Sequence, residues 1–151
     1  MKMKVLLENR QARFEYEPLE KFVAGVQLTG GEVKMLRHSK GSLAGAYVRV
    51  VGNELHLINA QIPPYPYARN EEYEPTRTRK LLVKKSEIIK FEEAQKQKGL
   101  TLIPWIVGLS GKYIKIEVAI ARGKSVTDKR RQVRERDIAR DTARELKDRG
   151  Y

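Results

Sequence analysis

The sequence predicts a mainly β protein, in which a small antiparallel barrel is followed by a basic C-terminal tail. Three observations predict this fold: short segments alternate apolar with polar residues, glycine-containing turns separate them, and charged residues dominate the last segment. A length of 151 residues suits one domain with an appendage. We therefore expect residues 1–122 to form the barrel and residues 123–151 to form the tail.

The first strands are predicted between residues 21 and 62. Residues 21–28 alternate with the period of a strand, so that their apolar side chains share one face. Residues 46–62 contain two strand-like runs separated by Gly52 and Asn53. Because glycine accepts a positive φ, this pair suits the tight turn of a hairpin.

Residues 100–121 repeat the strand pattern. Pro104 lies inside this run and cannot donate to a ladder, so its strand is expected to lie at an edge or to bend there. Several short antiparallel strands with few helices indicate a closed or nearly closed barrel. An OB-like barrel is one RNA-binding member of that class, and periodicity alone does not separate it from an SH3-like barrel.

Two short helices and a loop are predicted between the strands. The first helix is expected within residues 31–41, which place apolar side chains on one face. The second is expected within residues 86–99, with Ser86 as the N-cap and Gly99 just beyond the C-terminus. Residues 63–80 are rich in proline and tyrosine and predict a long irregular loop.

The chain is strongly basic. A formal net charge of +12 and a pI of about 10.0 indicate a polyanionic partner, with nucleic acid as the first candidate and an anionic membrane surface as the second. The absence of cysteine excludes disulfides and thiolate metal sites. Neither a membrane-spanning run nor a signal peptide can be identified, so a cytoplasmic protein with no membrane partner is expected.

Candidate catalytic residues are few. The histidines are His38 and His56, and a structural role is favoured for His56 because it lies within a predicted strand. With no cysteine and no second histidine nearby, neither forms a metal site. Residues 122–125 resemble the end of a phosphate-binding loop, but Val118 stands where that motif requires glycine. The acidic residues 70–74 favour a solvated loop over a catalytic pair, so we expect no enzyme, metal or cofactor.

Two basic clusters are candidates for contact with RNA phosphates. Arg10 and Arg13 form the first. Arg77 and Arg79, followed by Lys80, form the second. Spacing of i, i+2 in an extended backbone places both arginines of the second cluster on one face, where they would meet one row of phosphates. The alternative is an ordinary charged edge that prevents aggregation.

The tyrosines of the predicted loop are a second class of candidate RNA contacts. Tyr65, Tyr67 and Tyr73 are candidates for stacking on unpaired bases. Packing of the loop onto the barrel is the alternative explanation of these rings.

The tail has a helix-forming composition but too few apolar residues to pack on the barrel. In a helix, Arg136, Arg140 and Arg144 line up at i, i+4 and i+8. An isolated helix of this length is marginal in water. We therefore expect the tail to be disordered alone and helical on a phosphate-rich surface, with a permanently solvated tail as the alternative.

A set of sequence segments carries a family resemblance. In chain order they read ENRQARFEYE, AGVQLTGGEVKMLR, PPY, RTRKLLVKKSEI, KGLTLIP and IARGKSVTDKR. They occur in the family's order and cover essentially the whole chain. On these segments the chain closely resembles the SsrA-binding protein family, also called small protein B, the protein partner of tmRNA.

The resemblance implies an OB-like barrel that binds the tRNA-like domain of tmRNA near its elbow. It also implies delivery of alanyl-tmRNA to ribosomes stalled without a usable codon, with the tail in the decoding site and the empty mRNA channel. This process, trans-translation, tags the stalled peptide and frees the ribosome. The implied partners are tmRNA and the ribosome, and indirectly alanyl-tRNA synthetase and elongation factor Tu through tmRNA.

The resemblance also implies two groups of site residues. Asn9 and Glu32 match family positions, and the family's Glu is associated with tmRNA binding. With the basic clusters, the expected RNA-binding residues are Asn9, Arg10, Arg13, Glu32, Lys34, Arg37, Arg77, Arg79 and Lys80. The expected ribosome-binding residues of the tail are Gly123, Lys124, Asp128, Lys129, Arg130, Arg134, Arg136, Arg140 and Arg144. Thr127 departs from the family, which often has an aromatic residue or histidine before the DKR segment.

The alternative function is a structural ribosomal or translation-factor-like OB module without a tmRNA role. The DKR segment and the basic tail favour the tmRNA-binding interpretation. An RNA-processing enzyme has no catalytic constellation in its support.

Overall fold

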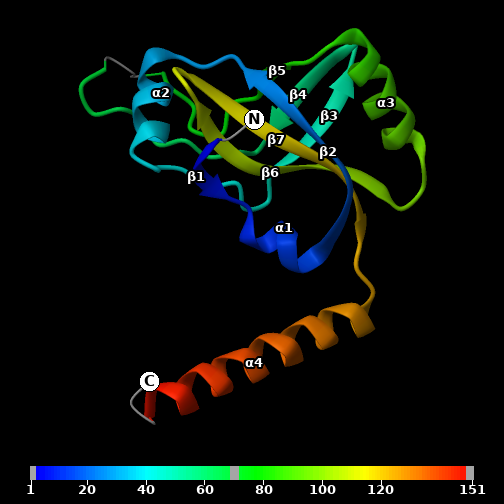
Figure 1. Ribbon diagram of the computed structural model, residues 1–151. Coiled ribbons are helices and arrows are strands. Elements are labelled where there is room, and N and C mark those ends of the chain that lie inside the picture. The colour runs from blue at the N-terminus through cyan, green and yellow to red at the C-terminus, as the bar shows by residue number, and fades with distance from the viewer. Residues whose placement is uncertain (1–2, 69–71, 149–151) are drawn as a thin grey trace.

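The computed structural model describes residues 3–68 and 72–148, apart from the side chains of residues 126–128 and 144–148. The elements, shown in Figure 1, are β1 (Lys4–Glu8), α1 (Arg10–Glu15), β2 (Tyr16–Val26), α2 (Gly30–Arg37), β3 (Tyr47–Val51), β4 (Glu54–Ile58), β5 (Arg79–Leu82), α3 (Lys85–Lys96), β6 (Leu100–Ser110), β7 (Tyr113–Gly123) and α4 (Val126–Asp148).

The strands form one antiparallel sheet that closes on itself as a barrel (Figure 1). Around the ring the order is β6-β3-β4-β5-β2-β7, and β7 pairs again with β6. β3 and β1 share the other edge of β6, where β3 pairs at Leu102 and β1 pairs between Ile106 and Leu109. The predicted mainly β barrel with short flanking helices is confirmed.

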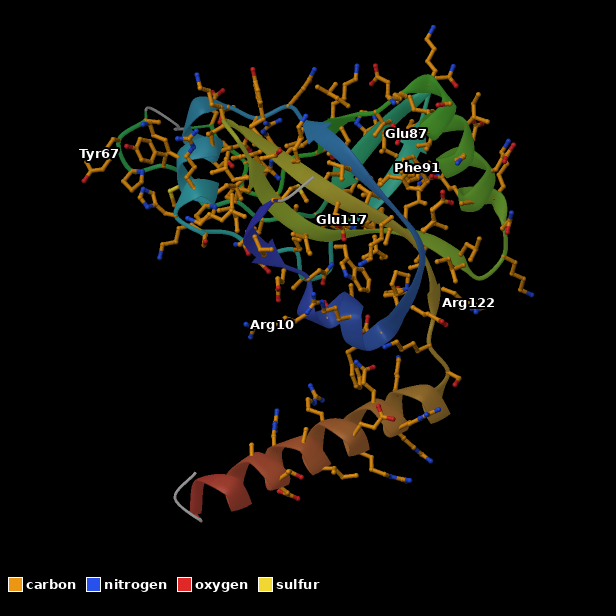
Figure 2. All side chains as sticks on the ribbon, in the orientation of Figure 1. Arg10, Tyr67, Glu87, Phe91, Glu117 and Arg122 are labelled. Atoms are coloured by element: carbon orange, nitrogen blue, oxygen red, sulfur yellow. The ribbon has the colours of Figure 1, made fainter. Side chains whose placement is uncertain are left out.

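Apolar side chains from alternate strand positions fill the barrel. Leu55, Leu81 and Val118 are among the fully buried ones. α3 packs on the barrel through Phe91, whose side chain points from the helix toward the strands (Figure 2). The ring of Phe91 lies edge-on to that of Phe22, with 4.7 Å between the centroids. Truncation of a buried phenylalanine to alanine costs about 3–5 kcal/mol, so this contact accounts for much of the attachment of α3.

The predicted hairpin connects β3 and β4. Its turn is formed by Gly52 and Asn53, whose φ values are +57° and +62°. Positive φ at both central residues is the geometry of a type I′ turn, which matches the right-handed twist of the flanking strands. Pairing runs from Val51–Glu54 to Tyr47–Ile58, so the prediction is confirmed.

β6 bends at Pro104 and does not lie at an edge. It pairs with β7 on one side and with β1 and β3 on the other, and its register with β7 shifts between Pro104 and Ile106. Proline has no N–H to donate to the ladder, and the shift in register falls at this position. The carbonyl of Pro104 accepts a hydrogen bond from Asn9 Nδ2 at 2.9 Å, which anchors the segment before α1.

β1, α1, the first half of β2 and β5 were not predicted. Residues 16–20 of β2 are exposed or half-buried and lack apolar alternation. Their extended state depends on pairing with residues 120–123 of β7, which are distant in sequence. Residues 79–82 form β5 through pairing with β4 and β2, so the irregular loop ends at Thr78.

The two predicted helices are present, with one corrected cap. Ser86 lies inside α3, and the N-cap is Lys84. The reason is Glu87, whose carboxylate accepts a hydrogen bond from the N–H of Lys84 at 3.1 Å and so fixes the start of the helix earlier. Gly99 follows the helix with a φ of +87°, a conformation that favours glycine.

α4 is a long helix that extends away from the barrel on the side of α1 (Figure 1). The N–H of Lys124 donates to the carbonyl of Glu15 at 2.8 Å, which fixes the point where the chain leaves β7. Lys124 Nζ donates to the carbonyl of Arg13 at 2.8 Å and to Oε1 of Gln132 at 2.6 Å. Residues 126–148 are helical, in agreement with the helix-forming composition of the tail. The contacts of this end of the tail with α1 are polar, so they do not contradict the expectation that the tail has too few apolar residues to pack on the barrel. That the helix requires the ribosome stays a prediction.

Candidate nucleic-acid interface

Glu32 lies in the first turn of α2 and is almost completely buried, with 2% of its surface exposed. Its Oε1 accepts a hydrogen bond from the N–H of Thr29 at 2.9 Å, and Thr29 Oγ1 accepts one from the N–H of Glu32 at 3.2 Å. This reciprocal pair is a capping box, which satisfies two otherwise free N–H groups. The helix start therefore fixes the position of the carboxylate.

Three side chains from the segment before and within β5 converge on Glu32. Arg79 Nε donates to Glu32 Oε2 at 2.7 Å, and Arg77 Nε donates to the same oxygen at 3.0 Å. A second nitrogen of Arg77 pairs with Glu32 Oε1. The hydroxyl of Tyr73 lies 2.9 Å from Glu32 Oε2. We refer to Glu32, Tyr73, Arg77 and Arg79 as the Glu32 hub.

The guanidinium of Arg79 is 0% exposed, and all of its nitrogens are bonded. Besides Nε, one terminal nitrogen donates to the carbonyls of Ala60 and Arg77 at 2.8 and 3.1 Å. The other donates to the carbonyl of Pro75 at 3.0 Å and to the hydroxyl of Tyr73 at 3.1 Å. A buried charge is tolerated when it is both paired and fully hydrogen-bonded, and Arg79 meets both conditions.

These contacts correct the predicted surface roles of the hub. Arg79 cannot meet a row of phosphates, because its side chain points into the protein and is enclosed. Arg77 is half-buried and bonded to Glu32, and the carboxylate of Glu32 does not lie on the surface. The spacing of residues 29–32, Thr-x-x-Glu, is the signature of a capping box and would have indicated that the Glu32 carboxylate turns back to the start of its own helix, but not that it is buried.

The hub keeps Glu32 ionised. Burial raises the pKa of this carboxyl, but hydrogen bonds from Arg77, from the Thr29 backbone and from Arg79 outweigh the effect of burial. The resulting pKa is about 2, lowered from an ordinary value of 4.5. Burial and the hydrogen bond to Glu32 raise the pKa of Tyr73, so its hydroxyl stays protonated at neutral pH.

Acidification is expected to remove the stability that ionised Glu32 provides. The pKa of about 2 in the folded state lies below the ordinary value of 4.5, so the contribution is fully present above the latter and is lost as the pH falls toward 2. The shift corresponds to about 3 kcal/mol of unfolding free energy. Urea unfolding at a series of pH values should show this loss in the unchanged protein and not in Glu32→Gln.

Glu93→Gln is the matched control for this pH dependence, because Glu93 is an exposed acid on α3. Its unfolding free energy should follow the same pH profile as that of the unchanged protein. An identical profile for Glu32→Gln would show that the hub does not hold an ionised carboxylate.

Asn9 is buried and caps α1. Its Oδ1 accepts a hydrogen bond from the N–H of Ala12 at 3.0 Å, while its Nδ2 donates to Pro104. Both ends of the amide are therefore used inside the protein. Asn9 is placed to position α1 and does not present its side chain to a partner.

The predicted cations on the helices α1 and α2 are exposed. Arg10 points from α1 into solvent (Figure 2). Arg13 lies 3.7 Å from Glu8, and an exposed pair of this kind holds it only weakly. Lys34 and Arg37 are exposed on α2, one turn apart. β1 runs directly into α1 and contacts α2, so the two basic helices flank one strand (Figure 1).

Lys80 lies elsewhere on the barrel. It is half-buried on β5, and its Nζ is 3.3 Å from Glu54 Oε1 on β4. The structure therefore brings together Arg77 and Arg79 in the hub and places Lys80 in a separate ion pair.

The tail cations are mostly exposed along α4. Exposed side chains among the predicted ones are those of Arg130, Arg134, Arg136 and Arg140, and Lys129 is half-buried. The guanidinium of Arg136 lies 5.9 Å from the ring centre of Phe14 on α1. Gly123 ends β7 opposite Tyr16. The side chains of Asp128 and Arg144 lie outside the described part of the structure.

Where the structure describes them, the other candidate groups form no second site. His56 is half-buried with Nε2 3.4 Å from Glu54 Oε2, and His38 is exposed after α2. Of the acidic segment 70–74, Asn70 and Glu71 lie outside the described residues. Within the described residues, no group of three or more His, Cys, Asp and Glu side chains is placed to hold a metal ion. Among the helices described, none is long and apolar enough to cross a membrane.

Comparison with protein families gives one match over most of the chain. A family model described as SmpB protein matches residues 6–148, which include the barrel and α4. An SsrA-binding protein of Novosphingobium aromaticivorans is 43% identical over 150 residues, and one of Zymomonas mobilis is 46% identical over the same length. Each match covers 99% of this chain and 94% of the relative.

Comparison with solved structures agrees with the sequence matches. A chain from the structure described as "tmRNA-SmpB: a journey to the center of the bacterial ribosome" is 41% identical and has a TM-score of 0.68. The match covers 80% of this chain and 85% of that chain.

Proposed function

The chain belongs to the SmpB protein family, and we propose that it binds the tRNA-like domain of tmRNA and delivers tmRNA to stalled ribosomes. The observation that carries this proposal is the family match, which extends from the barrel through α4 at residues 6–148. A relative that is 41% identical comes from a structure of tmRNA, SmpB and the ribosome, which supports both partners.

The charge distribution supports a polyanionic partner for the barrel. Residues 1–121 carry 20 Lys+Arg and 13 Asp+Glu, a net charge of +7. Exposed cations of this kind bind phosphates and release counterions, which gives affinity without base recognition. Arg10 and Arg13 on α1, with Lys34 and Arg37 on α2, are the exposed residues that we assign to this contact.

We divide the chain by task at residue 122. Residues 1–122 bind tmRNA, and residues 123–151 enter the decoding site and the empty mRNA channel of the ribosome. The exposed arginines of α4 supply the charge that such a phosphate-lined path attracts. The protein acts in the cytoplasm by binding and not by catalysis, and it meets alanyl-tRNA synthetase and elongation factor Tu only through tmRNA.

Glu32 and Asn9 contribute to RNA binding indirectly, because they hold the basic helices α2 and α1 in place. Asn9 caps the helix that carries Arg10 and Arg13, and Glu32 completes the capping box, with Thr29 as the N-cap, of the helix that carries Lys34 and Arg37. Loss of either cap is expected to disturb a basic helix and not to remove a direct RNA contact.

The test is to identify the RNA that the protein carries. We expect sequencing of RNA bound to the purified full-length protein to find tmRNA as one dominant species. Ribosomal RNA alone would contradict the proposal and would favour a structural ribosomal module.

The salt dependence of binding is expected to reveal the role of the α2 cations. The change is Lys34→Ala with Arg37→Ala, which removes two charges next to each other on an exposed helix face. Each phosphate contact contributes roughly 0.7–0.9 to the slope of log affinity against log salt, so the slope should fall by about 1.5. Affinities for tmRNA at a series of salt concentrations measure it.

Lys96→Ala with Lys98→Ala is the matched control, because it removes the same charge at the end of α3. α3 and α2 lie at opposite sides of the barrel (Figure 1). The control should leave the slope nearly unchanged. Equal slopes for both double variants would assign the salt dependence to net charge and not to α2.

A further inference from the structure

The loop between β4 and β5 presents two tyrosine rings beside α2. Tyr67 is 87% exposed, and Figure 2 shows it at the outer edge of the molecule, directed away from the barrel. Its ring lies edge-on to that of Tyr65, with 5.4 Å between the centroids and 67° between the planes. A single exposed ring is ordinary on a protein surface, so a partner is indicated only by the groups that surround the ring.

Local backbone geometry holds the two rings in place. The N–H of Ala68 donates to the carbonyl of Tyr65 at 3.1 Å, which closes a turn with Tyr67 near its tip. Prolines 64 and 66 flank Tyr65, and fixed φ angles reduce the freedom of this segment. Tyr65 approaches α2 so closely that a Cβ on Gly31 would lie 3.1 Å from its own Cβ. The ring of Tyr65, which contacts Tyr67, is therefore held in place in the free protein.

The Glu32 hub closes the base of this loop. The N–H of Ile62 donates to the carbonyl of Pro75 at 3.0 Å, which brings the two ends together. The hydroxyl of Tyr73 lies 2.9 Å from Glu32 and also 2.9 Å from the carbonyl of Ile62. A terminal nitrogen of Arg79 donates a hydrogen bond to the carbonyl of Pro75. The buried charges thus fix the loop to α2.

Positive charge lies next to the rings. Lys34 Nζ is 5.9 Å from the ring centre of Tyr65, and Arg37 is exposed one turn further along α2. A nucleotide needs a flat apolar surface for its base and a cation for its phosphate, and both are present here. The combination fits an unpaired nucleotide better than an apolar peptide, because an apolar peptide has no need of the cation.

We propose that Tyr67, whose ring contacts that of Tyr65 beside Lys34 on α2, is a stacking platform for an unpaired base of the bound RNA. This inference rests on the proposed function, since it assigns one contact within tmRNA binding. Tyr73, the third tyrosine of the loop, is a positioning residue, because its hydroxyl is bound in the hub. The RNA is recognised at this point by its exposed base face and not by a base sequence, since every base has such a face.

The test compares substitutions of Tyr67 in the full-length protein for their affinity toward full-length tmRNA. Tyr67→Ala lowers the affinity roughly 5- to 150-fold, the range that corresponds to one stacked base. Tyr67→Leu keeps apolar area without a ring, so its affinity falls as that of Tyr67→Ala does. Tyr67→Phe keeps the ring and therefore the affinity. The melting temperature stays unchanged in all three, because the side chain is 87% exposed.

Two further readouts separate stacking from charge. The salt slope of Tyr67→Ala equals that of the unchanged protein, since no charge is removed, in contrast to the slope of Lys34→Ala with Arg37→Ala. Tyr67→Trp adds an exposed fluorophore, while the native Trp105 is buried in a second core cluster and provides a constant background. Base stacking quenches the added emission when tmRNA binds.

The outcomes distinguish this inference from the function on which it rests. If the unchanged protein binds tmRNA and Tyr67→Ala binds equally well, the platform is wrong and the proposed function stands. Equal losses in Tyr67→Phe and Tyr67→Ala would indicate a hydroxyl contact and would also overturn stacking. If the unchanged protein does not select tmRNA over ribosomal RNA, the proposed function fails and the platform with it.

Discussion

Ending the chain after Ser125 is expected to abolish peptide tagging on stalled ribosomes while tmRNA binding stays close to normal. The barrel keeps its closure, because the pairing of β7 with β2 ends at Gly123. The described side chains that are removed are mostly exposed, so the barrel loses few apolar contacts. The deleted residues carry 9 Lys+Arg and 6 Asp+Glu, a net of +3, which predicts only a modest general loss of RNA affinity.

The truncation is placed after Ser125, and not at the predicted boundary after residue 122, because residues 123 and 124 contact the barrel domain. Gly123 pairs with Tyr16, and Lys124 donates to carbonyls of Glu15 and Arg13. A cut after residue 122 would remove both residues and would confuse loss of the tail with damage to β2 and α1. A cut after Ser125 tests the tail alone.

Tagging is measured in a reconstituted translation system with ribosomes stalled at the end of an mRNA, beside tmRNA affinity and melting temperature. A finer variant replaces residues 128–130 by alanine and keeps the rest of α4. We expect near-normal tmRNA binding and impaired tagging, because the family resemblance places the DKR segment where the tail enters the decoding site. Full tagging by the shortened chain would show that the tail is a solvated appendage.

Glu32→Ala is expected to destabilise the whole barrel. It leaves Arg79 buried without a counter-charge, and loss of one partner of a buried pair costs about 3–5 kcal/mol. It also removes the hydrogen bond from the N–H of Thr29 in the capping box of α2, which adds about 1 kcal/mol. For a chain of this size each kcal/mol lowers the melting temperature by about 2–4 °C, so a fall of roughly 10–20 °C is expected by calorimetry.

Two variants control this result. Glu93→Ala removes an exposed acid from α3 and should change stability by less than about 0.5 kcal/mol. Glu32→Ala combined with Arg79→Met removes both buried charges and should recover part of the loss, since an apolar replacement of a buried pair is often tolerated. An unchanged melting temperature for Glu32→Ala would show that the hub does not hold the fold.

The hub gives Glu32 a defined connection to RNA binding. Its loss would release the loop that carries Tyr65 and Tyr67 as well as the start of α2 with Lys34. We therefore expect weaker tmRNA binding in Glu32→Ala to accompany lower stability. The family's association of this position with tmRNA is compatible with a carboxylate that never touches RNA.

Local sequence determined the features that depend on neighbouring residues. Gly52 and Asn53 specify a type I′ turn by themselves, and alternating apolar residues specify the strands on either side. The bend at Pro104 follows from a missing N–H. The helical state of α4 follows from its composition. The family motifs, which extend over the chain in order, determined the partner class.

Only the tertiary structure decided the features that depend on residues distant in sequence. Residues 16–20 become a strand because β7 pairs with them, and no apolar pattern marks them. Arg77 and Arg79 have the spacing of a surface cluster, but Glu32, more than 40 residues earlier, draws both inward. A charged side chain is buried when a distant partner compensates its desolvation, and a local sequence pattern does not contain that partner. For the same reason the support of Tyr67 by α2 and the contact of Lys124 with α1 became visible only in the folded chain.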